Sequence, residues 1–162
     1  MNLPERRKQM IIYHGSKETV RQPEIRTTRY HKDFYFGFYC TIYAEQAKRW
    51  ALRFTGEGIV NKYEYTPDAG LKVLTFPEMT EEWLDFIAAC RLGTPHEYDI
   101  VEGPMANDTI FNYVQDFVDG LISRAAFWEL ARFKKPTHQI SFHTPKALGT
   151  LRFLKGEKIC EE

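Results

Sequence analysis

The chain has 162 residues, 43% of them hydrophobic and 15% aromatic, which suits a domain with one core and excludes a disordered chain. Basic and acidic residues number 22 each, so the net charge is zero. No apolar run approaches the roughly 18 residues that a membrane span needs, so we expect no membrane partner.

The predicted elements begin behind a polar, basic, flexible leader at residues 1–9 and form a single domain over 10–162. Hydrophobic periodicity and turn signals place the elements of the first half along the chain. These are a strand at 10–13 ended by His14-Gly15-Ser16, a polar connection at 17–32, a strand or tight loop at 34–39, a helix at about 43–54, strands at 59–65 and 71–76, and a helix from Thr80 to Gly93.

The second half continues the mixture of strands and helices. Its predicted elements are a strand at 98–102 closed by Gly103-Pro104, helices at about 109–119 and 123–133, a strand at 139–143, a short helix opened by Thr144-Pro145, and a strand at 151–159. The strands are short and lack the glycine fingerprint of a dinucleotide-binding crossover. The sequence therefore predicts an α+β fold. On its first long helix, Ala44, Ala47, Trp50, Ala51 and Phe54 share the predicted inner face.

Charge and cysteine content bear on partners and location. Residues 1–35 and 124–162 each carry 8 basic and 4 acidic side chains, around an acidic middle with 6 and 14. Two basic ends form a cationic face if they meet, which favours an anionic ligand or nucleic acid; solvated termini are the alternative. Three widely spaced cysteines and no secretory signal predict a cytoplasmic protein with reduced thiols.

Three places combine an apolar strand with a polar residue at its end. They are His14-Gly15-Ser16, Gly37-Phe38-Tyr39 and Gln139. A glycine after a strand-end histidine allows a ligand to approach the backbone closely. Taken one at a time, these residues also suit an ordinary strand end, a core aromatic and a solvent-exposed amide.

Taken in order, the segments resemble the ADP-ribosyltransferase superfamily, in its diphtheria-toxin and poly(ADP-ribose) polymerase branch, which is marked by a His-Tyr-Glu triad. The chain is most similar to a bacterial family of unknown function within that superfamily. The segments that carry the resemblance are Tyr13 to Ser16, Asp33 to Tyr39, Gln46 to Ala51 and Gly103 to Asp108, within about residues 10–153. The resemblance implies a split β-sandwich of short strands with flanking helices.

The resemblance also implies roles in cleaving NAD between nicotinamide and ribose. His14 would bind a ribose hydroxyl of the adenosine half, the Gly15 backbone would bind the nicotinamide carboxamide, and Tyr39 would stack on its ring. Ser16 belongs to the same binding segment, and Trp50 supplies a second stacking wall. Arg26 and Arg29 would face the pyrophosphate, with ordinary surface arginines as the alternative.

The chain departs from the family pattern at two positions. Gln139 stands where the triad has glutamate; an amide can bond the ribose 2′-hydroxyl but cannot act as a base. Ala47 replaces a serine that bonds nicotinamide. Glu102 and the pair Asn107-Asp108 are rival sources of a carboxylate outside the triad. Asn107 or Asp108 would position ribose or acceptor, whereas Asp108 also suits a helix cap.

The histidines show no zinc-ligand spacing, and the chain has no glycine-rich phosphate loop of the kinase or ATPase type, so no metal is expected. His138 and His143 are predicted on opposite faces of the strand that carries Gln139.

The expected function is a mono-ADP-ribosyltransferase, a pentosyl-type glycosyltransferase that uses NAD as co-substrate. His14, Tyr39 and Gln139 are its expected catalytic residues, and a protein or nucleic acid is its expected acceptor. Family analogy suggests an intracellular toxin of a toxin–antitoxin or phage-defence system, with an antitoxin protein as partner. Two alternatives stay open: an inert module that binds NAD or ADP-ribose, and an interaction protein without a small-molecule site.

Overall fold

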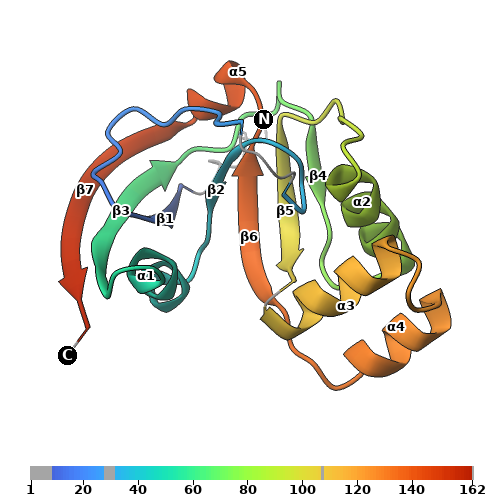
Figure 1. The fold of residues 1–162 in the computed structure, drawn as a ribbon. Coiled ribbons are helices and arrows are strands. Elements are labelled where there is room, and N and C mark those ends of the chain that lie inside the picture. The colour runs from blue at the N-terminus through green and yellow to red at the C-terminus, as the bar shows by residue number, and fades with distance from the viewer. Residues whose placement is uncertain (1–8, 28–31, 107, 162) are drawn as a thin grey trace.

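The computed structural model describes residues 9–27, 32–106 and 108–161, so residues 1–8 of the predicted leader lie outside the described part. Short strands and helices are interspersed along the chain (Figure 1). The strands are β1 (Met10–Ser16), β2 (Phe38–Cys40), β3 (Glu57–Tyr65), β4 (Val73–Thr75), β5 (Ile100–Met105), β6 (Thr137–Phe142) and β7 (Leu151–Cys160). The helices are α1 (Ala44–Leu52), α2 (Glu81–Arg91), α3 (Asp108–Val118), α4 (Arg124–Ala131) and α5 (Pro145–Leu148).

The strands form two sheets that meet at one junction. One sheet is antiparallel, in the order β1-β3-β7, and the other has the order β2-β6-β5-β4 with β4 and β5 parallel. At the junction, Tyr13 of β1 and Thr41 exchange backbone hydrogen bonds of 2.8 and 2.9 Å. From there the sheets diverge like the two sides of an arch (Figure 1). The fold is therefore α+β with two sheets of short strands, as the sequence predicts.

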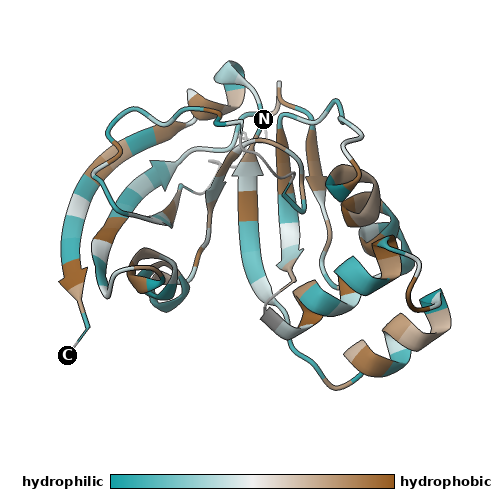
Figure 2. Cartoon of the chain, viewed as in Figure 1, coloured by the Kyte–Doolittle hydropathy of each residue, from teal (hydrophilic) through white to brown (hydrophobic). Residues whose placement is uncertain are grey.

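Two apolar clusters hold these layers together. One joins residues of both sheets, including Ile12 and Tyr63 of the first sheet and Phe38 and Phe142 of the second. The other packs α2, α3 and α4 on the opposite face of the β2-β6-β5-β4 sheet, around the fully buried Trp83. Figure 2 shows brown, hydrophobic stretches on this sheet and on the helices beside it. Apolar side chains therefore cover this sheet on both faces.

Helix α1 packs closely on β1 and β3 because the contact is formed by glycine and alanine residues. A Cβ atom added at Gly58 would lie 2.3 Å from the Ala51 carbonyl oxygen, and Ala47 and Ala51 are buried in the contact. Trp50, predicted on this face, is half-buried, whereas Phe54 is 70% exposed. The prediction for Phe54 is wrong because α1 ends at Leu52, so the helical period does not reach it.

The predicted caps of α2 and α5 are confirmed, whereas Asp108, the third predicted cap, is the first residue of α3. The Thr80 hydroxyl accepts a hydrogen bond of 3.2 Å from the Trp83 N–H at the start of α2, and Gly93 follows that helix with a φ of +94°. The Thr144 hydroxyl likewise accepts from the Ala147 N–H at 3.1 Å, with Pro145 in the first turn of α5.

Two predicted strand ends are wrong. β1 continues through His14-Gly15-Ser16, because these residues pair with Asn61, Val60 and Ile59 of β3. β5 continues through Gly103-Pro104, which pair with Gln139 and His138 of β6. The proline is tolerated because β4 pairs with β5 only as far as Glu102, which leaves the far edge of β5 free at that point.

Among the helices of the described residues, none has the length and apolar composition that crossing a bilayer requires.

Candidate functional site

His14 and Tyr39 meet at the junction of the two sheets. The His14 Nδ1 atom lies 2.6 Å from the Tyr39 carbonyl oxygen, and the His14 ring packs on that of Phe38 with centroids 4.3 Å apart. A carbonyl oxygen only accepts hydrogen bonds, so Nδ1 must carry the proton. In a neutral ring this leaves Nε2 as a hydrogen-bond acceptor, which can receive a hydroxyl proton.

Burial keeps the His14 ring neutral. The pKa of His14 falls to about 4, mainly because of burial; the hydrogen bond to the Tyr39 carbonyl opposes this effect, and the positive charges of Lys32 and Arg26 add to it. At neutral pH the ring is therefore an uncharged acceptor and not a cation.

The Tyr39 phenol is fixed within the core. It is 7% exposed, donates a hydrogen bond to the Tyr35 carbonyl oxygen and accepts one of 3.1 Å from the Phe34 N–H. Burial raises the pKa of Tyr39 well above its ordinary value, so the hydroxyl stays protonated. The Lys32 ammonium lies 4.9 Å from the centroid of the Tyr39 ring. That ring thus already accommodates a cation.

Gln139 lies on the same face of the sheet as Tyr39. Tyr39 pairs with Ser141 across β2 and β6, and Gln139 is two residues before Ser141. Its side chain is 3% exposed, and its Nε2 atom has no hydrogen-bond partner; the buried Thr137 Oγ1 on the same face has none either. An unpaired buried polar atom costs roughly 1–3 kcal/mol. This cost makes the site a candidate for a bound polar group.

The three residues of the expected triad do not all touch one another. His14 reaches the backbone of Tyr39, and Gln139 is a diagonal neighbour of Tyr39 in the sheet. Within the described residues, no hydrogen bond joins the Gln139 side chain to His14 or Tyr39. The structure therefore places the His14 ring on Phe38 and against the Tyr39 backbone, and Gln139 beside Tyr39 in the sheet, without a hydrogen-bonded triad.

The space beside Gly15 is occupied by helix α1 and not by a ligand site. A Cβ atom at Gly15 would lie 2.2 Å from the Ala47 carbonyl oxygen, 2.8 Å from the Ala51 nitrogen and 3.0 Å from the Trp50 Cβ. The missing side chain therefore makes room for the backbone of α1, which corrects the expectation that it leaves room for a ligand. Trp50 of α1 lies beside Gly15. The Ser16 hydroxyl accepts from the Glu18 N–H at 3.3 Å.

Cations surround the His14 end of the junction. Arg26 is exposed and forms a backbone bridge with Gly37, and its charge reaches His14. Lys32, whose charge reaches His14, and Arg53, whose charge reaches Lys32, were not predicted from the sequence; burial and then the charge of Arg53 lower the pKa of Lys32. Only the placement of α1 beside β1 brings Arg53 here, so no spacing signal could have found it.

Some predicted residues lie outside the described part. Arg29 and Asn107 are among them, and the structure describes only the backbone of Asp108, which begins α3.

Glu102 belongs to the other face of the sheet. It pairs with Ile140, the neighbour of Gln139, and its carboxylate lies 2.9 Å from His138 Nε2. His143, on the Gln139 face, lies 2.7 Å from the Ser141 hydroxyl. The predicted separation of the two histidines is thus confirmed, and Glu102 does not replace the missing carboxylate at Gln139. In the described residues, no group of histidine, cysteine and acidic side chains is arranged to hold a metal ion.

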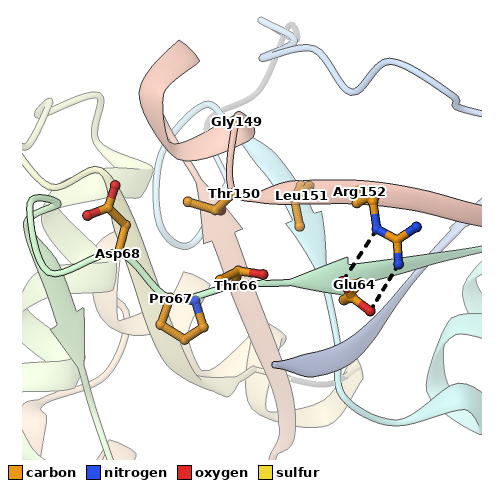
Figure 3. A pocket seen from close by; sticks show the side chains of 8 residues that line it. All are labelled: Glu64, Thr66, Pro67, Asp68, Gly149, Thr150, Leu151 and Arg152. Atoms are coloured by element: carbon orange, nitrogen blue, oxygen red, sulfur yellow. Dashed lines mark hydrogen bonds and ion pairs between the residues drawn. The ribbon is translucent and has the colours of Figure 1, made fainter. Parts of the chain in front are cut away.

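A hollow of about 370 Å³ lies away from this junction, beside the ends of β3 and α5 and the start of β7 (Figure 3). Two of its lining residues, Arg152 and Glu64, form an ion pair with 3.1 Å between Nη2 and Oε2. None of the residues that line it belongs to the expected site.

A comparison with protein families matches residues 10–153 to the family described as "Protein of unknown function (DUF3990)". The chain belongs to this family. No curated protein matches it. The DUF3990 match covers the residues that carry the expected resemblance, so membership of a family of unknown function is confirmed.

Two of the segments that carry the resemblance contain residues that stabilise the fold, Asp33 and Gln46. Asp33 forms a buried ion pair with Arg91 at 2.7 Å, which ties the segment before β2 to α2. The Gln46 amide donates to the His138 carbonyl oxygen at 2.6 Å and accepts from the His138 N–H at 3.2 Å. Both contacts anchor the strands β2 and β6, and thereby Tyr39 and Gln139.

Proposed function

We propose that this protein is an NAD-dependent mono-ADP-ribosyltransferase whose site lies at the junction of β1, β2 and β6. The observation that carries the proposal is the neutral His14 ring, held by the Tyr39 carbonyl at 2.6 Å with its Nε2 atom as acceptor. A ribose hydroxyl is a donor that suits this acceptor. The resemblance to the ADP-ribosyltransferase superfamily over about residues 10–153 assigns the same histidine that role.

The side chains around this junction suit NAD, which combines a negatively charged pyrophosphate with a positively charged nicotinamide ring. Arg26, Lys32 and Arg53 suit the pyrophosphate. The ring of Tyr39, which carries the Lys32 ammonium at 4.9 Å, suits the positively charged nicotinamide ring. In this reading Lys32 yields its place on the ring to nicotinamide when NAD binds.

The reaction breaks the bond between the nicotinamide nitrogen and C1′ of the ribose, and the bonding electrons leave with nicotinamide. The acceptor's nucleophilic atom then bonds C1′ and loses its proton to solvent. In the proposed complex the unpartnered Gln139 Nε2 donates to a ribose hydroxyl oxygen and orients the sugar. Because an amide takes no proton, the acceptor must already be nucleophilic, which favours a single transfer over polymer growth.

The test is the release of nicotinamide from NAD by the purified protein. We expect turnover in the wild type, and a loss of roughly 100-fold or more in His14→Ala, since an oriented polar contact is removed. Arg53→Ala should raise KM, whereas the exposed Arg152→Ala, remote from the junction, should leave the rate unchanged. Equal rates in His14→Ala and the wild type would contradict the proposal.

The second candidate is an inert module that binds NAD or ADP-ribose. Gln139 in place of a carboxylate favours it, since the amide cannot act as a base. Calorimetry separates the two: binding that His14→Ala abolishes, without nicotinamide release, identifies the module. Neither binding nor release would leave an interaction protein.

The acceptor and its biological setting are separate parts of the proposal. We infer a macromolecular acceptor and an intracellular role as a toxin or defence effector, restrained by an antitoxin protein, from the family resemblance. Labelled NAD added to a cell lysate, followed by nuclease or protease, identifies the acceptor class by which treatment removes the label.

A further inference from the structure

Three side chains clamp the backbone turn that precedes β2. The carbonyl oxygens of three consecutive residues, 34, 35 and 36, each accept a hydrogen bond from a different side chain. Tyr35, in the middle, has a φ of +76°, a conformation that a non-glycine residue adopts at a cost. The donors are His96 Nε2 to Phe34 at 2.8 Å, Tyr39 Oη to Tyr35, and His143 Nδ1 to Phe36 at 2.7 Å.

The geometry fixes the protonation of His96. Its Nε2 carries the proton that reaches the Phe34 carbonyl, and its Nδ1 accepts the Tyr98 N–H at 3.0 Å. A second proton, on Nδ1, would point at that N–H, so only the neutral ring satisfies both contacts.

His143 is coupled to His96 by proximity. The two ring centroids are 4.4 Å apart, so two protonated rings would repel each other strongly. The His143 Nε2 lies 2.7 Å from the Ser141 hydroxyl, whose single proton also faces the Val101 carbonyl oxygen at 3.1 Å. The ring also meets Tyr39 edge-on, at 6.2 Å between centroids.

Among the described residues, neither ring forms an ion pair with a carboxylate, although Glu97 lines the same hollow. α2 presents Phe86 to His96, with centroids 5.3 Å apart, and the tyrosines that face the pair are Tyr35, Tyr39 and Tyr98. Glu97 has a 94% exposed side chain near Lys72, and the Asp99 carboxylate is bound to the Thr144 hydroxyl at 2.6 Å. Burial lowers the pKa of both histidines, that of His143 to about 4.

Solvent reaches the pair from one side. His96 and His143, with Tyr35 and Tyr98, line a hollow of about 230 Å³ that opens to the surface. A proton can therefore arrive without unfolding of the core.

We propose that His96 and His143 are positioning residues that hold Tyr39 in place until both rings are charged, so that acid opens the turn and disables the junction. The three hydrogen bonds to the carbonyl oxygens of residues 34–36 belong to the fold, whereas any effect of their loss on NAD turnover rests on the proposed function.

The test is hydrogen–deuterium exchange of residues 32–41, corrected for intrinsic rates, at pH 7.5 and 4.5. In the wild type we expect exchange to rise roughly tenfold or more at the lower pH, while β3 stays protected as the internal reference. Unchanged protection of residues 32–41 at pH 4.5 would overturn the proposal, whether or not the protein turns over NAD.

Donor-preserving variants separate these histidines from His14, which also titrates near pH 4. The double variant His96→Gln and His143→Asn keeps an N–H at both positions but does not titrate. It should stay protected at both pH values, whereas His143→Phe should exchange fast at both. If residues 32–41 of the double variant exchange faster in acid, as in the wild type, the effect belongs to His14 and the proposal is wrong. If the double variant misfolds, the proton NMR titration of His143 in the wild type must coincide with the loss of protection.

Discussion

Two buried glutamines have opposite hydrogen-bonding situations. Gln46 is 2% exposed and bonds both backbone groups of His138, whereas Gln139 is 3% exposed and has an unpaired Nε2. The first amide contributes to stability, and the second costs stability in the free protein. Such a cost is tolerated where a polar group serves a site.

The pair of glutamines gives a matched prediction at the residue scale. Gln46→Leu should lower the free energy of unfolding by roughly 1–3 kcal/mol, because it leaves the His138 groups unpaired. Gln139→Leu should be neutral or stabilising, because it removes an unpaired amide, and should abolish NAD binding. Urea unfolding and calorimetry check the two effects. A loss of stability in Gln139→Leu as large as in Gln46→Leu would show that the Gln139 amide is paired in the free protein.

At the scale of elements, the segment that leads into β2 is fastened from three sides. Asp33 pairs with Arg91 of α2, and the next turn is held by His96 and His143. Arg91 also donates to the Phe111 carbonyl oxygen of α3 at 3.1 Å. One arginine thus links the entrance of β2 with two helices, so the position of Tyr39 depends on the helical layer.

The Asp33–Arg91 pair predicts strong coupling between α2 and the segment before β2. Asp33→Asn or Arg91→Met alone should destabilise the protein by roughly 3–5 kcal/mol, because the partner is left as a buried, unpaired charge. The double variant should cost less than the sum of the two. A double-mutant cycle in urea measures this coupling, and additive losses would mean that the two side chains act independently.

The sequence predicts these elements well where the signal is local. The caps at Thr80 and Thr144 follow from a hydroxyl before a helical period, and the structure confirms both. The ends of β1 and β5 were misplaced, because glycine and proline mark breaks only where no neighbouring strand pairs with them. Pairing with β3 and β6 decides those ends, and it is not visible in a local window.

At the scale of the whole molecule, the junction buries histidines that are neutral when folded. The pKa of His14 and of His143 falls from 6.5 to about 4 on folding. The unfolded chain therefore binds more protons than the folded one between these values. Asp99 contributes to the pH dependence of stability at lower pH, because hydrogen bonds from the Thr144 hydroxyl and the Lys72 N–H lower the pKa of its carboxyl.

The stability of the protein should accordingly depend on pH in a defined window. The contribution of the two histidines is fully present above about pH 6.5 and is lost as the pH falls towards 4, by roughly 1–3 kcal/mol for each ring. Urea unfolding at pH 7 and at pH 4.5 measures the loss. The variants His14→Asn and His143→Asn should each flatten the dependence, and an unchanged slope in both would contradict the assignment.

The sequence by itself determined the α+β class, the helix caps and the segments around His14, Tyr39 and Gln139, because each depends on periodicity or on residue types at short spacing. Only the tertiary structure decided which face each side chain occupies. It set Glu102 on the other face of the sheet from Gln139, brought Lys32 to His14 and Arg53 to Lys32, and filled the space at Gly15 with α1. These outcomes follow from strand register and from helix docking between residues far apart in the chain, which local propensity does not encode.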